Sequence, residues 1–273
     1  MSSITGLSPD EISRLGTAAI AALKPADWQA FSPQQMAALT SAQVAVIPAA
    51  GWNAITPAQV AALDSDGVTG LNAHSLPLLS SEQFAALVPD QLAALPTQGL
   101  HALTSRQAPA LNAAVLDALD VSQVQAIATA ALTAMSTDQI AALGSPEVSQ
   151  LSAAQLHALL THQVASLSTD SVAGLASDQV TALSATQLGS MTNAQLQALT
   201  PDQASRLAST QTAGLHSNQL TALGSDQLQA LDSQAFAGLT AKALSGLSSE
   251  QLGLLSGDQL SALPTAAING LAT

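Results

Sequence analysis

Apolar residues recur along the whole chain at a fixed interval of eight. One series begins at Leu7, continues through Leu15 and ends at Leu271, and all 34 of its positions are Leu, Ile, Met or Phe. A second series lies three residues earlier, from Ile4 to Ile268, and is apolar everywhere except at Thr212. Self-similarity at a constant period is the sequence signature of a repeat protein. The repeat fills residues 1–273, so we predict a single array with no linker and no second domain.

The repeated unit is an octapeptide of the form (Ser/Thr)-x-x-Gln-(Leu/Val)-x-Ala-Leu, as at residues 136–143. Ala, Leu and Gln favour helices, and apolar residues three positions apart lie on one helical face. One continuous helix does not fit, because eight residues at about 100° each turn the apolar stripe by about 80° per repeat. We therefore expect the chain to end one helix and start another in most octads.

Several local signals mark where each helix starts. The residue after the first series is Ser, Thr, Asp or Asn in 20 of 34 octads, and these are preferred N-cap residues. A Gln stands three residues later in 19 octads, which completes a capping box, and the Leu before the cap is placed for a hydrophobic staple. Six prolines fall at the first helical position, where the missing N–H costs nothing: Pro9, Pro25, Pro33, Pro57, Pro89 and Pro201.

These signals predict an all-α solenoid, a superhelix of about 34 short capped helices with one helix of about two turns in each eight-residue repeat. Between Gln43 and Glu147 the Gln position alternates with other residues, which suggests helices paired into 16-residue units. The number of helices in one superhelical turn stays open. A β-solenoid is the competing fold, but the octads lack the period-two alternation and β-branched residues of strands.

Composition excludes several functional classes. The 273 residues contain five Lys and Arg against 18 Asp and Glu, a formal charge of −13, so a basic surface for nucleic acid is absent. Without Cys there is no disulfide framework, thiol catalysis or Cys-ligated zinc. Polar residues interrupt every apolar run before about 18 residues, so we expect no membrane insertion. No cleavable signal peptide is visible in the first residues.

The acidic residues are candidates for general acid–base or metal chemistry, but their positions favour a structural role. Negative charge in the first turn of a helix is stabilised by free amide hydrogens and by the helix dipole. In the octad frame, three acids are at the cap (Asp64, Asp120, Asp232) and three at the third helical position (Glu11, Asp27, Glu147). Eleven are at the second position: Asp10, Asp66, Glu82, Asp90, Asp138, Asp170, Asp178, Asp202, Asp226, Glu250 and Asp258.

Other residue types offer no recognisable site. The five histidines form no pair spaced for a helical metal site, and we interpret them as exposed variable positions: His74, His101, His157, His162 and His216. The aromatic residues all occupy the two apolar series, so we predict that they lie in the core: Trp28, Phe31, Trp52, Phe84 and Phe236. No nucleophile elbow, phosphate loop or dinucleotide fingerprint is present. We therefore predict no catalytic, cofactor-binding or metal residues and no cofactor, and the location of any binding residues stays unknown.

The octads at 192–199 and 248–255 resemble a repeat type of very large bacterial secreted or surface proteins. Those proteins carry runs of Leu-Thr-x-x-Gln-(Val/Ile)-x-Ala-Leu, are described as adhesin-like or haem-utilisation proteins, and often contain RTX calcium repeats. The resemblance covers nearly the whole chain and implies a secreted or cell-surface location in a bacterium. The sequence departs from it in having no haem-attachment motif and no Gly-Gly-x-Gly-x-Asp calcium repeat.

Two functions are consistent with this sequence. The first is a non-enzymatic repeat scaffold that acts as a spacer in a secreted or surface protein. The second is a protein- or peptide-binding module that uses the concave face of the superhelix, although its variable positions lack the aromatic and Arg residues common at binding hot spots. Self-association and a protein partner both stay open. A contiguous exposed apolar patch would favour binding, whereas a uniformly Ser, Thr and Gln surface would favour the spacer.

Overall fold

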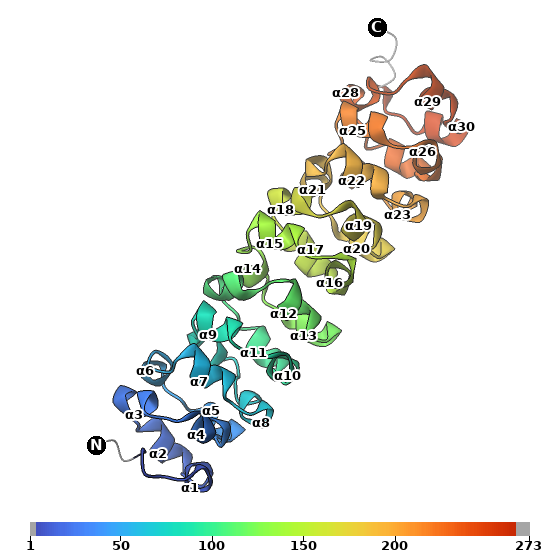
Figure 1. The fold of residues 1–273 in the computed structure, drawn as a ribbon. Helices are drawn as coiled ribbons and strands as arrows, with labels where there is room; N and C mark the ends of the chain where they lie inside the picture. The colour runs from blue at the N-terminus through green and yellow to red at the C-terminus, as the bar shows by residue number, and fades with distance from the viewer. Residues whose placement is uncertain (1–3, 266–273) are drawn as a thin grey trace. The chain divides into compact units, whose positions relative to one another are not determined.

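The protein is helical throughout the part that the structure covers. The computed structural model describes residues 4–265, and in that range it contains thirty α-helices, two 3-10 helices and no β-strand. The predicted all-α class is confirmed there, and the β-solenoid is excluded. The chain divides into two compact units, Met1–Ser136 and Thr137–Thr273. Within each unit, short helices follow one another in stacked layers (Figure 1).

The elements of the N-terminal unit are α1 (Pro9–Ser13), α2 (Thr17–Ala21), α3 (Pro25–Gln29), α4 (Pro33–Ala37), α5 (Ser41–Val44), α6 (Ala49–Trp52), α7 (Pro57–Ala61), α8 (Ser65–Val68), η1 (Leu76–Leu78), α9 (Ser81–Ala85), α10 (Pro89–Ala93), α11 (Thr97–Leu100), η2 (Ser105–Ala110), α12 (Ala113–Asp117), α13 (Val121–Ala126) and α14 (Thr129–Leu132). The elements of the C-terminal unit are α15 (Thr137–Ala141), α16 (Ser145–Gln150), α17 (Ala153–Ala158), α18 (Thr161–Ser166), α19 (Thr169–Ala173), α20 (Ser177–Ala182), α21 (Ala185–Ser190), α22 (Asn193–Ala198), α23 (Pro201–Ser205), α24 (Ser209–Thr212), α25 (Ser217–Ala222), α26 (Ser225–Ala230), α27 (Ser233–Phe236), α28 (Ala241–Leu244), α29 (Ser249–Gly253) and α30 (Gly257–Ser261).

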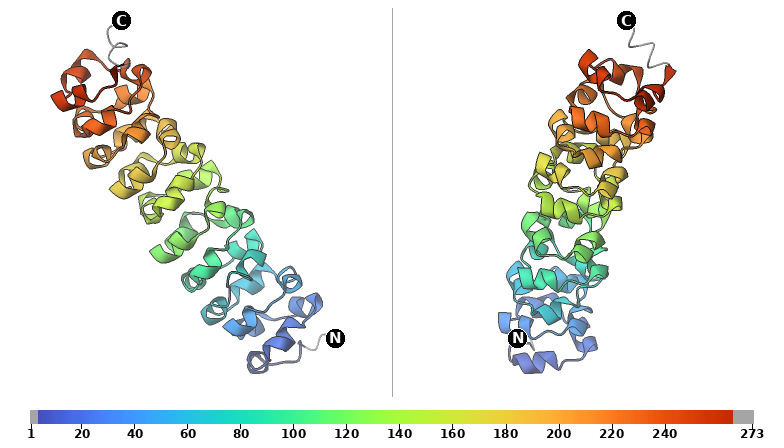
Figure 2. Two further views of the ribbon diagram at one scale, coloured as in Figure 1. Left: turned by 180° about the vertical axis from the view of Figure 1, so that it is seen from behind. Right: turned by 90° about the vertical axis from the view of Figure 1, so that its right-hand side faces the viewer.

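Each α-helix is shorter than the two turns expected from the sequence. The helix α8 has four residues, α1 has five and α17 has six, which corresponds to roughly 6 to 9 Å of helix. The remaining residues of each octad form the turn and the cap. Ser152, for example, is extended, with φ −69° and ψ 158°, and its side chain accepts a hydrogen bond from the backbone N–H of Gln155. An extended cap redirects the chain between successive helices, as the two further views show (Figure 2).

Two octads form 3-10 helices instead of the predicted α-helices. Both carry proline at the fifth position after the cap of the octad, Pro77 in η1 and Pro109 in η2. Proline lacks the N–H that an α-helix needs there, and its ring clashes with the carbonyl group four residues earlier. The tighter hydrogen bond from Leu78 N to Ser75 O, at 3.0 Å, is compatible with the ring.

The two apolar series form the core of each unit. In the second series Ile12, Trp52 and Val180 are fully buried, and in the first series Leu71 is fully buried and Leu183 is 2% exposed. Near the end of the described residues the second series reaches the surface, and Leu260 is 42% exposed.

Helices stack on the third helix along the chain. The contacts include α1 with α4 and α4 with α7 in the N-terminal unit, and α16 with α19 and α19 with α22 in the C-terminal unit. This interval differs from the two-helix unit that the alternating Gln positions suggested. At two of the positions without Gln the cause is a backbone contact far back in the chain: ideal Cβ atoms on Gly67 and Gly99 would lie 2.7 and 2.3 Å from the carbonyl oxygens of Leu39 and Leu71, which leaves no room for a side chain.

The small residue before each Leu of the first series also allows close packing. An ideal Cβ on Gly70 would lie 2.2 Å from Ser41 O, and one on Gly214 would lie 2.0 Å from Ala185 O. Both distances are far below van der Waals contact, and in each case the neighbour is a backbone carbonyl group of an earlier helix. The backbones of neighbouring octads therefore approach closely at these glycines.

Candidate functional site

The Gln of the repeat forms the same set of hydrogen bonds in many octads of residues 4–265. Its Oε1 accepts the backbone N–H of the cap residue, and its Nε2 donates to backbone carbonyl groups of an octad far back in the chain. In Gln195 the Oε1 lies 2.7 Å from Thr192 N, and the Nε2 lies 2.9 Å from Val164 O and 2.7 Å from Leu167 O. We call this arrangement, in which Nε2 is bonded to the carbonyl group at a sequence separation of 28, a glutamine bridge.

In residues 4–265, we identify sixteen glutamines whose bridge joins two octads of the same unit, and all but Gln251 also bond the carbonyl group at a separation of 31. They are Gln35, Gln43, Gln59, Gln83, Gln91, Gln107, Gln123, Gln179, Gln187, Gln195, Gln203, Gln211, Gln219, Gln227, Gln251 and Gln259.

The bridges satisfy the ends of two helices at once. The first amide hydrogens and the last carbonyl groups of any helix have no partner inside it, and burying them unpaired is costly. Gln195 is only 2% exposed, so its amide pairs with these backbone groups out of contact with water. One Gln therefore closes the start of its own helix and the end of a helix about three and a half octads earlier.

The bridge also explains why the cap residue tolerates substitution. Val88, Leu160 and Ala208 have no side-chain acceptor, yet their backbone N–H groups still donate to the Oε1 of the following Gln at 2.9, 2.9 and 3.0 Å. Only the half of the capping box that depends on the cap side chain is lost. Ser171 stands where most octads have Gln, and its hydroxyl donates to Leu143 O at 3.0 Å, which preserves one bond of the bridge.

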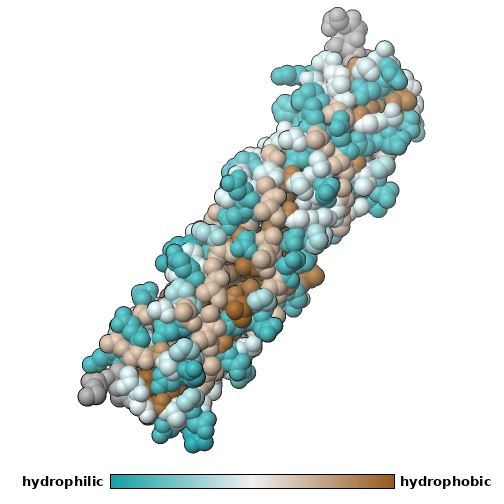
Figure 3. All heavy atoms as spheres, in the orientation of Figure 1, coloured by the Kyte–Doolittle hydropathy of each residue, from teal (hydrophilic) through white to brown (hydrophobic). Residues whose placement is uncertain are grey.

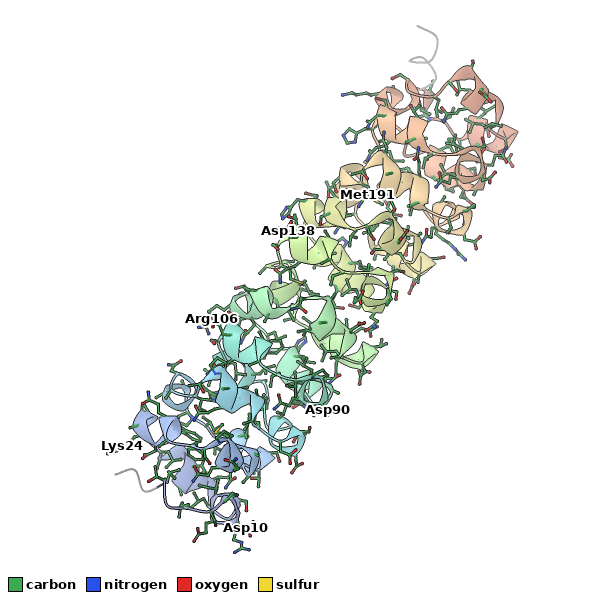
Figure 4. All side chains as sticks on the ribbon, viewed as in Figure 1. Asp10, Lys24, Asp90, Arg106, Asp138 and Met191 are labelled. Carbon is green, nitrogen blue, oxygen red and sulfur yellow. The ribbon has the colours of Figure 1, made fainter. Side chains whose placement is uncertain are left out.

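The acidic residues lie where the sequence placed them. All eleven acids of the second position stand second in their helices and are exposed, and Asp120 accepts a hydrogen bond from Gln123 N at 2.8 Å as a cap. Asp10, Asp90 and Asp138 mark such positions in Figure 4. The backbone N–H and hydroxyl of Ser8 donate to the Glu11 carboxylate and hold its pKa below the ordinary value of a glutamate.

The histidines are dispersed, as the sequence indicated. All five are exposed, and the structure brings none of them into a group of three His, Asp or Glu side chains suited to a metal ion within residues 4–265. His157 Nδ1 lies 2.8 Å from Ala182 O, and His216 Nδ1 lies 2.9 Å from Gln219 Oε1. These contacts join each ring to its own unit.

The aromatic side chains lie in the core, as predicted. Trp28, Trp52, Phe84 and Phe236 are fully buried, and the rings of Trp28 and Phe31 stack with centroids 4.9 Å apart. The Nε1 atoms of both tryptophans are buried without a hydrogen-bond partner.

The exposed surface carries few large apolar side chains. In residues 4–265 they are Val88, Val121, Leu160 and Leu260, which are 42 to 52% exposed. On the face shown in Figure 3, the most hydrophobic residues form small groups, and weakly hydrophobic residues form a band between hydrophilic ones within each unit.

Several open depressions occur among the helices, and two of them contain a histidine. One of about 480 Å³ is lined by residues including Ala185, Gly189 and His216, and one of about 490 Å³ by residues including Ala73, Thr97 and His101. Small side chains dominate both linings, and each depression contains a single histidine.

No helix within residues 4–265 has the length and apolarity needed to cross a bilayer. Neither a protein-family model nor a curated protein sequence matches the chain.

Sequence reasoning missed the second half of the Gln side chain's role. The octapeptide predicted a capping box, for which Glu serves as well as Gln and also suits the helix dipole. Yet Gln occupies this position in 19 octads and Glu only at Glu11 and Glu147. A preference for amide over carboxylate is the signal that the donor Nε2 has acceptors of its own.

Proposed function

We propose that this chain is a solenoid that serves as a non-enzymatic spacer or scaffold. The observation that carries the proposal is the glutamine bridge, which recurs at the same sequence separation in both units, as at Gln59 and Gln195. Bonds at separations of 28 and 31 are what a superhelix with between three and four octads per turn requires. Such an array is stabilised by nearest-neighbour interfaces, so its length can change by whole repeats.

The surface supports a spacer more than a binding module. Only four large apolar residues are exposed in residues 4–265, and all eleven acids at the second helical position are exposed. Binding faces usually contain clustered aromatic or Arg side chains. The resemblance of the octads to repeats of large secreted bacterial proteins supports a secreted or surface location.

The solenoid is tested by deleting one complete octad, residues 184–191, from the full chain. The deletion gives Gln195 the same separations from Leu156 and Leu159 that Gln187 has in the wild-type chain, so every bridge finds an equivalent partner. We expect unchanged helicity per residue by circular dichroism and a shorter maximum dimension by small-angle X-ray scattering. The matched control deletes only the segment 185–189, which shifts the frame and should unfold the neighbouring octads. Equal damage from both deletions would contradict the solenoid.

The spacer role is tested against the binding alternative by affinity capture from the cells that produce the protein. The bait is the full chain, and the control is a variant with Val88, Val121 and Leu160 each replaced by Ser. A spacer predicts the same background proteins with both baits. A partner that the wild-type chain retains and the triple variant loses would favour a binding module and refute the spacer.

A further inference from the structure

The glutamine bridges do not by themselves specify which octads pair. Gln187 bonds the carbonyl groups of Leu156 and Leu159, and Gln195 bonds those of Val164 and Leu167, with the same geometry. Every octad of this kind offers the same donor and the same two acceptors. A chain of interchangeable units needs another feature to exclude windings in which a helix pairs one octad too early or too late.

The N-terminal unit contains a pair of residues that departs from the repeat, Trp28 and Gly51. Gly51 stands at the third position of α6, where most octads have Gln, and Trp28 lies in α3, the helix on which α6 packs. An ideal Cβ on Gly51 would lie 2.7 Å from Trp28 Nε1 and 2.9 Å from Ile47 Cγ2. The indole of Trp28 therefore fills the space beside α6 that a Gln side chain at position 51 would occupy. No residue larger than Gly fits at position 51.

Other residues of the second apolar series leave room for the Gln. Trp28 precedes Gly51 by 23 residues. At the same interval Met36 precedes Gln59, Val60 precedes Gln83 and Phe236 precedes Gln259. Each of these three glutamines forms its bridge. Neither Trp stands opposite a Gln, although some smaller residues also lack one, as Val44 does opposite Gly67. The residue in the corresponding place opposite Trp52 is Ser75, which is also fully buried and is not Gln.

For stability alone, Trp is an unfavourable residue at positions 28 and 52. Trp28 Nε1 and Trp52 Nε1 are buried without an acceptor, and a buried donor without a partner costs free energy that a Leu at the same position avoids. Natural proteins do give up stability for features that exclude alternative structures.

We infer that Trp28 and Gly51 form a register lock, in which the indole fits only opposite an octad without a Gln and thereby fixes how the first helices of the array wind. The lock excludes pairing with the flanking octads, because Gln43 and Gln59 would place a side chain where the indole lies. This inference concerns how the array is built and does not depend on its use as a spacer.

The test is a double-mutant cycle in the full chain with Gly51→Gln, Trp28→Leu and the double variant. Gly51→Gln restores the residue of the repeat, yet we expect it to lower the urea midpoint by roughly 0.5 M or more. Trp28→Leu should make room for it, so the double variant should have a higher midpoint than Gly51→Gln alone. Additive effects, or a Gly51→Gln variant as stable as wild type, would overturn the inference. So would a double variant that does not fold.

A second measurement separates a lock from ordinary packing. With the indole gone and Gln at position 51, the octads become interchangeable, so hydrogen exchange followed by mass spectrometry should show two isotope envelopes for peptides within residues 17–63 of the double variant. The wild-type chain should show one. A single envelope in the double variant would mean that Trp28 only fills space, and the register lock would be wrong.

The matched control for both measurements is Ser171→Gln in the C-terminal unit. Val148 precedes Ser171 by 23 residues, as Trp28 precedes Gly51. A Gln fits opposite a Val at this interval, because Gln187 forms its bridge opposite Val164. One envelope and no large loss of the urea midpoint are expected. A loss as large as that of Gly51→Gln would show that the indole is not the cause, and the lock would be refuted.

Discussion

The dual role of the repeat Gln can be tested by changing one atom, in Gln195→Glu. The introduced carboxylate keeps the acceptor for Thr192 N but replaces the Nε2 donor with a second oxygen, facing Val164 O at 2.9 Å and Leu167 O at 2.7 Å. Two hydrogen bonds are lost, at about 1 kcal/mol each, and two buried carbonyl groups lose a partner. With the cost of a buried anion opposite two dipoles, we expect a loss of roughly 3 kcal/mol or more at neutral pH.

The effect of pH follows from the sign of the pKa shift. Burial and the two carbonyl oxygens raise the pKa of the introduced carboxyl above its unfolded value of about 4.3. Below that value the group is protonated in both states and can donate one hydrogen bond, so the penalty is smallest. The penalty then grows as the pH rises from the unfolded pKa to the folded pKa, and is constant above it.

The assay is urea denaturation of the full chain, followed by far-ultraviolet circular dichroism at neutral and acidic pH. The matched control is Gln197→Glu, which makes the same change two residues later in α22 at an exposed position and should stay within about 0.5 kcal/mol of wild type. Similar midpoint shifts for the two variants would refute the bridge as a source of stability. A penalty for Gln195→Glu that does not shrink at acidic pH would refute the electrostatic part of the reasoning.

Three further predictions concern packing, caps and charge. Gly214→Ala should be destabilising because its Cβ would lie 2.0 Å from Ala185 O, whereas Gly253→Ala, a helical position with nothing within 4 Å, should stabilise the chain by roughly 0.5–1 kcal/mol; opposite shifts of the two urea midpoints check this. Val88→Ser should raise the stability measured by urea denaturation by about 1 kcal/mol, because it supplies the missing side-chain cap of α10, and no gain would contradict the assigned cap. The pKa of Glu11, followed by NMR titration, should lie below the ordinary value of a glutamate and rise in Ser8→Ala; the stability that this carboxylate contributes is present above its unfolded pKa and is lost as the pH falls through the lowered folded pKa.

Local features could be predicted from the sequence because their causes lie within one octad. The cap at Thr192, the acid at Asp202 and the proline at Pro201 each depend on residues within four positions, and the structure places all three as expected. The 3-10 helices were predictable in the same way, since Pro77 and Pro109 stand at the fifth position after the caps of their octads, where an α-helix needs an N–H. The positions of these two prolines in the octad carry that signal, but the prediction of an α-helix in most octads did not take it into account.

Long-range features could not be predicted, because they depend on which earlier octad packs against a given octad. The close approach of Gly70 to Ser41 O, for example, depends on how many octads separate two stacked helices, and the repeat itself does not specify that number. The alternation of Gln with smaller residues suggested a two-helix unit, when its causes at Gly67 and Gly99 are contacts with the backbone of helices far back in the chain. An eight-residue period fixes each helix without fixing how many helices complete a turn.

The bridge also accounts for the unusual charge balance. At the second helical position the side chain is exposed and meets only free amide hydrogens, so an acceptor is favoured and a carboxylate is best, as at Asp90 and Asp138. One residue later the side chain is buried between amide hydrogens on one side and carbonyl oxygens on the other, so it must accept and donate. Gln does both without charge, whereas Glu cannot donate when ionised. The rule places most acids outside and amides inside, with Glu147 as a buried exception, which yields a chain with 18 acids, five cations and a polar core made mainly of Gln.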